Sequence, residues 1–552
     1  MAVLLALGAA ACGASSASAT PPDAIRVGGP SAPGDAKVAI VGSGGDLRGR
    51  AFRVVDSSGR AVLRGRLAGA GGSAAPWRHA ARADLSRVRA PGAYRVRFGD
   101  LTSRPWIVRT NAVSAPIRAI LGFFAANADG REPSPAHGPA HLRDAVVATG
   151  PHAGEAFDLT GGWMDAGDML KFTHTTAYAA AALQVAARLD RADAPALTAA
   201  ADVGVRWLLK AHPAPDLFIA QVGDERDHEL GFRDPAGDDA SGKVGIATRV
   251  AYANIGGDLG GKAAAALALA AERAGAAPAS QAASAPALLD AARDWYAAGV
   301  AAGGVAPKLG APSGDFYSGD TAQDALAAGA AALYRVTGER RYLDDALRYL
   351  GAITPDGRLG WNAMAGFAAA DLCGALGAPG AADRAARATA CAALGAQGRA
   401  ALARARRGAF RTPGDFTWGQ TGESSGAGAL AAFAGGAIGL PGGLAGGAAA
   451  RDWLLGRNPW GASFVTGYGP KAPRHPHHWS SLAGPGRPRG AVVGGPAPLA
   501  DILAQDLGAP RRSPFDTAGA TYEDRVDDYV TSEPAIDYAA SAVLLLAALA
   551  GR

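Results

Sequence analysis

The chain has 552 residues, of which 49% are hydrophobic and 19% are charged, and its formal net charge is +5. This composition indicates a folded globular protein of about two domains and argues against wholesale disorder. The net charge is modest and no long block of basic residues occurs, so nothing in the sequence favours nucleic acid as a partner.

Residues 1–21 are predicted to be a secretory signal segment. A short apolar run, Val3 to Leu7, is followed by Ala17-Ser18-Ala19, a small-x-small pattern typical of signal cleavage sites. The run is too short to cross a bilayer as a mature helix. Cys12, which follows three alanines, offers a second interpretation as a lipoprotein anchor. We therefore expect a secreted or periplasmic protein without a membrane-spanning helix.

Residues 22–110 carry the pattern of a β-rich module. Short alternating or β-branched runs occur at 37–41, 50–55 and 92–98, and Ser57-Ser58-Gly59 and Ala90-Pro91-Gly92 are typical turn sequences between them. Several short strands at this spacing predict a β-sandwich.

Residues 111–552 change to helical periodicity, with Gly and Pro between the segments. The tight link Thr337-Gly338-Glu339 predicts antiparallel neighbouring helices. Cys373 and Cys391 lie in Ala-rich helical sequence, and we expect both to be buried free thiols. About twelve candidate helices begin near Ala115, Thr175, Ala196, Leu259, Leu288, Asp320, Arg341, Trp361, Ala382, Ser425, Ala448 and Ala535.

The segment 161–172, GGWMDAGDMLKF, places Asp165 and Asp168 three residues apart between glycines and aromatic residues. If this turn is helical, the two carboxylates lie on one face. Close like charges raise proton affinity and suit general-base work on water. The structural alternative is a helix cap with a polar turn, since Asp favours both.

A second acidic segment, residues 522–538, places Glu533 just before the last predicted helix. Taken alone, such a Glu is a first-turn carboxylate that the helix dipole favours. Cleavage of a glycosidic bond, however, needs one carboxylate base and one carboxylic acid. The two segments together contain both kinds of group.

A third segment, residues 473–479, contains His475, His477 and His478 and ends in Trp479. Zinc sites need three or four ligands. Prolines stiffen this segment, and neither Cys nor a further His lies near in sequence, so we expect no metal here.

The acidic segments and the histidine segment resemble motifs of glycoside hydrolase family 9, the inverting cellulases and their relatives. The N-terminal module resembles the immunoglobulin-like domain that often precedes their catalytic domain. The resemblance implies a multidomain protein, in which an immunoglobulin-like β-sandwich is followed by an all-α (α/α)6 barrel of six inner and six outer helices. It also implies that Asp168 is the base, that Asp165 holds the same water, and that Glu533 is the proton donor.

The resemblance further implies a set of substrate-binding residues, and this chain departs from the family pattern at three positions. Ser532 and Ala539 stand where relatives commonly have Asn, and Trp479 stands where they usually have Arg, which replaces a charged sugar contact with a stacking surface. The residues expected to bind substrate are Trp163, His477, His478, Trp479, Trp418 and Tyr529.

The resulting expectation is a secreted, monomeric, inverting endo-β-1,4-glucanase that acts on β-linked oligo- or polysaccharide without an organic cofactor. Structural calcium is a further expectation, with Asp224, Asp227 and Asp238 as candidate oxygen ligands. One alternative is an exo-acting member, such as an exo-β-glucosaminidase or a β-glucosidase-like enzyme. Another is a non-catalytic carbohydrate-binding protein on the same scaffold, which the presence of all three carboxylates disfavours.

Overall fold

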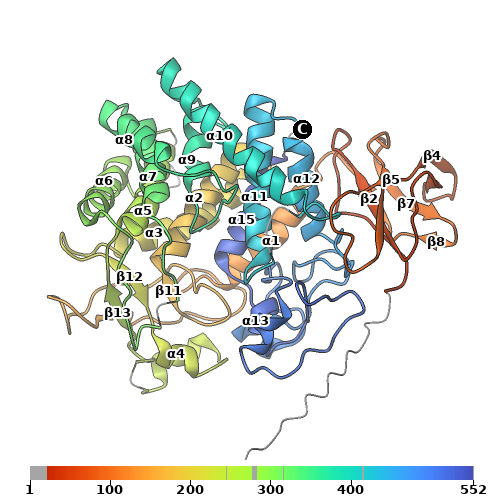
Figure 1. The fold of residues 1–552 in the computed structure, drawn as a ribbon. Coiled ribbons are helices and arrows are strands. Elements are labelled where there is room, and N and C mark those ends of the chain that lie inside the picture. Colours follow the sequence, from red (N-terminus) through yellow and green to blue (C-terminus); the bar gives the residue numbers. More distant parts are fainter. Residues whose placement is uncertain (1–20, 244, 277–281, 315, 413–415, 551–552) are drawn as a thin grey trace, which may run out of the picture.

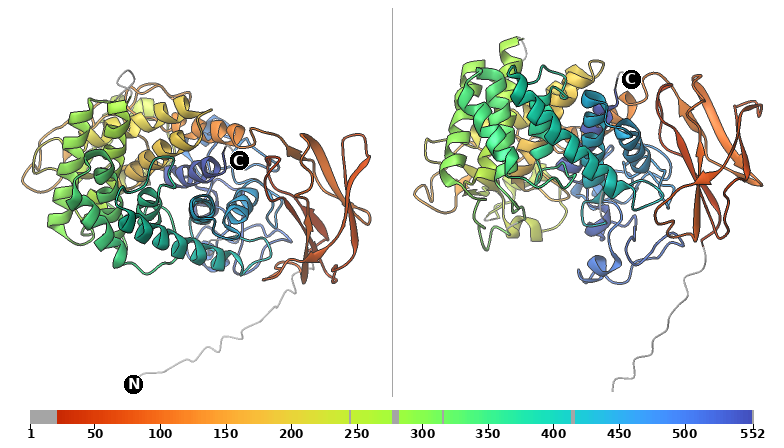
Figure 2. Two further views of the ribbon diagram at one scale, coloured as in Figure 1. Left: turned by 90° about the horizontal axis from the view of Figure 1, so that it is seen from above. Right: turned by 45° about the horizontal axis from the view of Figure 1, so that its top comes forward.

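The computed structural model describes residues 21–243, 245–276, 282–314, 316–412 and 416–550. The predicted signal segment and Cys12 thus lie almost wholly outside the described residues. A β-rich part comes first and a helical part follows, side by side in every view (Figures 1 and 2). Within the described ranges, no helix is both long enough and apolar enough to cross a membrane.

The N-terminal part is the predicted β-sandwich, built from two antiparallel sheets. In β7, Tyr94, Val96 and Phe98 are buried while Arg95 is exposed, which is the alternation of a strand with one face in a core. One sheet has the order β1 (Ala24–Arg26), β2 (Val38–Ser43), β6 (His79–Asp84), β5 (Ala68–Gly69). The other has the order β4 (Ala61–Arg66), β3 (Ala51–Val55), β7 (Gly92–Phe98), β8 (Leu101–Thr102), with β9 (Trp106–Val108) also paired to β7.

The helical part is a closed barrel, as predicted. Six helices contact one another in a ring, each touching the next and the last returning to the first: α2 (Thr173–Leu189), α5 (Gly257–Ala276), α7 (Gln323–Thr337), α9 (Ala365–Cys373), α11 (Gln420–Ile438) and α15 (Ile536–Ala548). The outer helices pack against this ring: α1 (Ser114–Ala126), α3 (Ala194–Lys210), α6 (Ala285–Ala302), α8 (Arg340–Gly351), α10 (Arg384–Ala405) and α12 (Gly443–Leu454).

The abundance of Ala and Gly is explained by the inner ring, whose helices are enclosed on all sides. A Cβ on Gly261 of α5 would lie 2.3 Å from the backbone of Ala325 in α7, so only glycine allows these two helices to approach so closely. Small side chains therefore set the spacing of the ring.

The barrel has one end at which the functional segments gather. The 161–172 segment, Tyr317, Trp361 and Glu533 each lie just before an inner helix, so all four lie near N-terminal ends of the ring. In Figure 1 this is the lower end, where the short elements lie. These are α4 (Glu225–Glu229), α13 (Leu499–Leu503), α14 (Tyr529–Ser532), and a small sheet of the order β10 (Val146–Val147), β13 (Val250–Ala253), β12 (Ile219–Val222), β11 (Lys171–Phe172).

The β-sandwich is fastened to the barrel by buried polar and aromatic contacts. Arg451 of α12, 1% exposed, is ion-paired with Asp35 of the sandwich and with Asp452. The Trp77 ring lies 6.0 Å from that of Phe410 and 5.5 Å from that of Phe515. The sandwich keeps a core of its own, and Ile40, Ala70 and Trp77 on its barrel-facing side join the core of the barrel.

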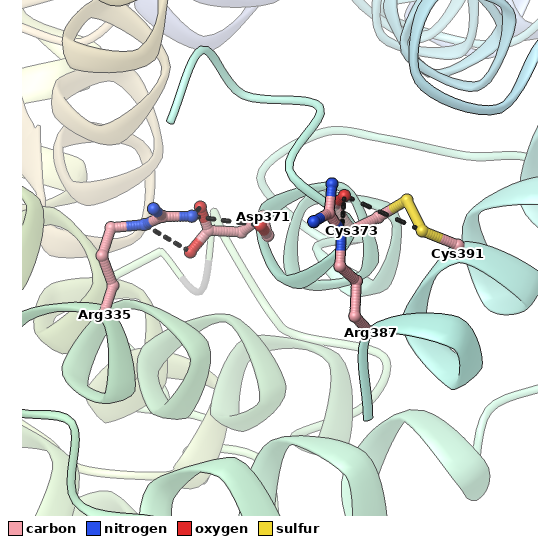
Figure 3. Close-up of a disulfide and its surroundings, with 5 residues drawn as sticks. All are labelled: Arg335, Asp371, Cys373, Arg387 and Cys391. Carbon is pink, nitrogen blue, oxygen red and sulfur yellow. Dashed lines mark hydrogen bonds and ion pairs between the residues drawn. A yellow bond between two sulfur atoms is a disulfide. The ribbon is translucent and has the colours of Figure 1, made fainter. Parts of the chain in front are cut away.

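The prediction of free thiols is wrong, because Cys373 and Cys391 form a disulfide (Figure 3). Cys373 ends α9 and Cys391 lies in α10, and packing of these two helices brings their Cα atoms to 4.8 Å. Arg387 donates to the carbonyl oxygen of Cys373, and Arg335 of α7 pairs with Asp371, two residues before Cys373. The bridge thus ties an inner helix to its outer neighbour.

Candidate active site

Residues 161–170 form an irregular loop and not a helical turn; Lys171–Phe172 form β11, and α2 begins only at Thr173. The conformation of the loop is fixed by backbone bonds: Asp165 N–H donates to the Leu170 carbonyl, and the Asn127 side-chain amide donates to the Met164 carbonyl. Ile536 N–H, at the start of α15, donates to the Asp165 carbonyl at 2.9 Å. The loop is therefore held against the segment that carries Glu533.

Asp165 is 1% exposed and accepts two hydroxyl hydrogen bonds, from Thr175 at Oδ1 and from Tyr317 at Oδ2, both at 2.5 Å. Burial raises the pKa of Asp165 to about 7, against the lowering effect of these two donors. The nearby Asp168 charge raises it further. The pKa of Asp165 thus lies near neutral pH, and a hydrogen bond to each oxygen fixes the orientation of its carboxyl group.

Asp168 is more accessible, with its side chain 18% exposed. Its Oδ1 accepts from Leu170 N–H, and its Oδ2 lies 2.8 Å from Nδ1 of His228 in α4. The hydrogen bond to Asp168 raises the pKa of His228 to about 9, so the imidazole is protonated at neutral pH. A carboxylate that is partly open to water and oriented by a cation suits a general base.

Glu533 lies directly opposite this loop. Its Oε1 accepts from Gly167 N–H at 3.2 Å, and a Cβ on Gly167 would lie 2.9 Å from that oxygen and 2.3 Å from the His477 carbonyl oxygen. Glycine is therefore required where the loop passes the acid. Burial, and secondly the Asp168 charge, raise the pKa of Glu533 to about 8, which keeps the carboxyl protonated at neutral pH.

Aromatic rings flank the three carboxyl groups on two sides. On one side the His477 ring lies 4.7 Å from Phe232 and 5.5 Å from Tyr529, and Tyr529 lies 5.6 Å from Trp418, which is 43% exposed. On the other side Tyr317 lies 4.8 Å from Phe172 and 4.9 Å from Trp361. Two cavities adjoin these walls. One is beside Tyr317, and the other, of about 470 Å3, is lined by His475, Arg511, Tyr522, Glu523, Asp524, Arg525 and Val526.

Three predicted substrate-binding residues are buried away from this surface. Trp163, 1% exposed, packs on Phe124 and fills the space left by Gly204 of α3. Trp479, 3% exposed, packs beneath the loop on Met164 and Met169. Neither ring presents a face on which a sugar can stack, so the prediction is wrong for both.

His478 is also fully buried, and it supports the loop indirectly. Its Nδ1 accepts from Ser480 N–H, and burial lowers its pKa, so Nε2–H donates to Asn127 Oδ1 at 2.9 Å. Asn127 in turn holds the Met164 carbonyl. His478 therefore orients the amide that shapes the loop and does not face the carboxyl groups.

The three candidate calcium ligands are engaged by arginines instead. Asp224 pairs with Arg226, while Asp227 and Asp238 both pair with Arg233. The charges of these carboxylates are thus balanced by arginines within the protein. Over the described ranges, no group of three His, Cys, Asp or Glu side chains is arranged to hold a metal ion.

Three side chains that contact the carboxyl groups, those of Thr175, Tyr317 and His228, were not among the predicted site residues. Tyr317 precedes α7, and the sequence signal was an aromatic pair, Phe316-Tyr317, beside glycines between two predicted helices. His228 lies in a stretch that matches the family in order, but nothing in the sequence indicates that it reaches Asp168, 60 residues away.

Comparison with known proteins agrees with this geometry. Residues 115–546 match the family described as Glycosyl hydrolase family 9, and residues 32–103 match the Cellulase N-terminal ig-like domain. Endoglucanase 14 of Arabidopsis thaliana is 31% identical over 266 residues, which cover 46% of this chain and 51% of that protein. The chain thus spans about half the length of this relative.

Solved structures match over nearly the whole chain. A single-mutant thermostable endoglucanase from Alicyclobacillus acidocaldarius has a TM-score of 0.79 and 27% identity, covering 96% of this chain and 100% of that one. AaCel9A in complex with cellobiose-like isofagomine has a TM-score of 0.77 and 26% identity, with 96% and 100% covered. Since the family match takes in the whole barrel and every carboxyl group of the site, the chain belongs to glycosyl hydrolase family 9 and carries the family's N-terminal immunoglobulin-like domain.

Proposed function

We propose that this protein is an inverting endo-β-1,4-glucanase that acts on cellulose-type glucans. The observation that carries the proposal is the placement of Glu533, whose Oε1 contacts the backbone of the loop that bears Asp165 and Asp168. One carboxyl group with a raised pKa and one partly exposed carboxylate oriented by a cation thus lie at one site, as acid and base catalysis of glycoside cleavage requires.

The reaction takes place in one step. Asp168 accepts a proton from water as the water oxygen forms a bond to the anomeric carbon. The bond from that carbon to the leaving oxygen breaks on the opposite face, and Glu533 donates its proton to that oxygen. Asp165, fixed by Thr175 and Tyr317, is the second acceptor for the attacking water. Because attack and departure occur on opposite faces, the anomeric configuration inverts.

The sugar chain is proposed to lie between the two aromatic walls. His477, Tyr529 and the exposed Trp418 offer ring faces and polar edges on one side, and Tyr317 and Trp361 offer them on the other. Aromatic rings stack on the apolar faces of sugar rings. The endoglucanase names of the similar proteins support a glucan as the substrate.

The setting of the enzyme is proposed as follows. The Cys373–Cys391 disulfide supports an oxidising compartment, in agreement with a signal segment at residues 1–21. Because the proposed chemistry uses side-chain acids and bases alone, we propose that the enzyme needs no organic cofactor. We also propose that it acts as a monomer.

Two assays test the proposal. Proton NMR of the first product from a β-linked cello-oligosaccharide should show the α-anomer. Viscosity of carboxymethylcellulose should fall much faster than reducing ends accumulate, because an endo-acting enzyme cuts inside chains. The first appearance of the β-anomer would refute inversion, and a slow fall in viscosity with rapid release of short products would refute endo action.

A further inference from the structure

A buried ionic cluster lies directly behind the catalytic loop, and none of its members faces the substrate. It contains the acidic residues Asp129, Asp144, Asp227 and Asp238 and the basic residues Lys171, Arg233, Arg249 and His141. The Lys171 and Arg249 side chains are 0% exposed. Burying so many charges is costly unless each is paired, and here every one is.

Arg249, next to β13, is the hub of the cluster. Its Nε and Nη2 form a two-pronged pair with Asp144 at 2.9 and 2.6 Å, and Nη2 also lies 3.3 Å from Asp129. Its Nη1 donates to Asp227 at 3.2 Å and to the Met169 carbonyl at 2.5 Å. Met169 directly follows the proposed base, so this hydrogen bond holds the backbone on which Asp168 is mounted.

Lys171 anchors the opposite end of the same loop. Its ammonium is shared between Asp129 and Asp144, at 3.0 and 2.6 Å, and also donates to the Leu159 and Gly161 carbonyls. Lys171 therefore holds the start of the loop and Arg249 holds the Met169 carbonyl near its end. Because both cations pair with Asp129 and Asp144, these two carboxylates set the distance between them.

A second route runs from Arg249 to the side chain of Asp168. Asp227 lies in α4 and is held by both Arg249 and Arg233. The residue that follows it, His228, pairs with Asp168 Oδ2. A shift of the Arg249 guanidinium thus displaces both the backbone that carries the base and the imidazole that orients it.

We propose that Arg249 is a positioning residue for the catalytic base, acting on Asp168 through the Met169 carbonyl and through Asp227 and His228. The proposal rests on the assignment of Asp168 as the base. A guanidinium is required because its planar fork reaches Asp144, Asp227 and the Met169 carbonyl at once, whereas a lysine ammonium is a point charge on a flexible stem. A displacement of about 1 Å at a reacting group costs about a hundredfold in rate.

The test is the conservative substitution Arg249→Lys, which keeps the buried charge but removes the fork. The matched control is Arg335→Lys, in α7, where the same substitution disrupts a buried pair with Asp371 (Figure 3) and a bond to the Pro379 carbonyl. Arg335 lies near the C-terminal end of α7, away from the catalytic end of the barrel. Both variants should lose thermal stability.

Only Arg249→Lys should lose kcat, by about tenfold to a hundredfold, with KM on cello-oligosaccharides unchanged, because the base and not the sugar is misplaced. A wild-type kcat in folded Arg249→Lys would overturn the proposal, as would a rise in KM at constant kcat. If the wild-type enzyme itself showed no β-glucan hydrolysis, the proposed function would fail instead, so the two failures are distinguishable.

Two further variants keep the test decisive if Arg249→Lys does not fold. Arg233→Lys lies one contact further from the base, so kcat should fall by a smaller factor, again at constant KM, and an unchanged kcat would count against the proposal. A double-mutant cycle combines each arginine variant with His228→Gln. If Arg233 acts through His228, the double variant should lose little more than His228→Gln alone, whereas additive losses would refute that route.

Discussion

The proposed proton donor, Glu533, gives the sharpest prediction, because burial and the Asp168 charge raise its pKa from an ordinary 4.5 to about 8. With an ordinary pKa of 4.5, only about 1% of Glu533 would carry a proton at pH 6.5, whereas a pKa of about 8 leaves about 97% protonated. The surroundings of Glu533 thus raise the fraction of competent acid about a hundredfold at that pH.

The perturbation is Glu533→Gln, which keeps the side-chain shape but has no proton to donate. On cello-oligosaccharides kcat/KM should fall by about 10²–10⁴-fold, the usual contribution of a general acid. On 2,4-dinitrophenyl β-cellobioside, whose leaving group needs no protonation, the loss should be far smaller. The substitution Glu339→Gln, directly before α8 and paired with Arg293, is the matched control and should leave both rates near wild type.

The pH profile gives a second measurement of the same residue. Since the protonated form is active, kcat/KM of the wild type should fall as the pH rises through about 8, and this alkaline limb should be absent in Glu533→Gln. Equal losses on the two substrates, or an alkaline limb that survives the substitution, would show that Glu533 is not the proton donor.

Three further predictions concern stability and substrate contact. The variant Cys373→Ser/Cys391→Ser should lose about 3 kcal/mol of unfolding free energy, because that is the usual contribution of a bridge closing a loop of about this length, while kcat stays unchanged. Chemical denaturation of the wild type and the variant measures this loss, and an unchanged midpoint would contradict it. Burial and then Arg249 act to lower the pKa of His141, but Asp129 and Asp238 outweigh them and raise it above 6.5. The stability gained from His141 is thus fully present below pH 6.5 and is lost as the pH rises through the folded-state pKa. Denaturation curves should therefore show that the stability difference between wild type and His141→Asn shrinks with rising pH. A difference that stays constant with pH would refute the linkage. Trp418→Ala should raise KM on cello-oligosaccharides without changing the melting temperature, whereas Trp479→Ala should lower the melting temperature, and the reverse pattern would exchange their roles.

Much of the architecture was present in local sequence signals. The predicted helix starts lie within a few residues of the observed ones, because helical periodicity, caps and Gly or Pro punctuation are properties of neighbouring residues. Asp165, Asp168 and Glu533 were singled out by the resemblance of their short segments to family motifs, and each segment ends at the start of an inner helix.

The contacts around those carboxyl groups depend on residues far apart in the chain. Tyr317 and Asp165 are 152 residues apart, and His228 and Asp168 are 60 apart, so only the tertiary fold brings each pair together. Asp227 and Asp238 likewise resemble calcium ligands in the sequence, but the tertiary structure pairs both carboxylates with Arg233.

Burial was likewise decided by tertiary structure. Trp163 and Trp479 are aromatic residues of the kind that stack on sugars, but both rings are enclosed. Trp163 packs against Gly204 of α3, and Trp479 packs on Met164 and Met169. Cys373 and Cys391 become a disulfide because α9 and α10 pack side by side. The sequence alone indicated which helices form and, through its resemblance to a family, where the proposed catalytic carboxyl groups lie along the chain. Which side chains face the substrate, and which charges are already paired, was decided only by packing, because the free energy of exposing or pairing a side chain depends on segments that sequence proximity does not reveal.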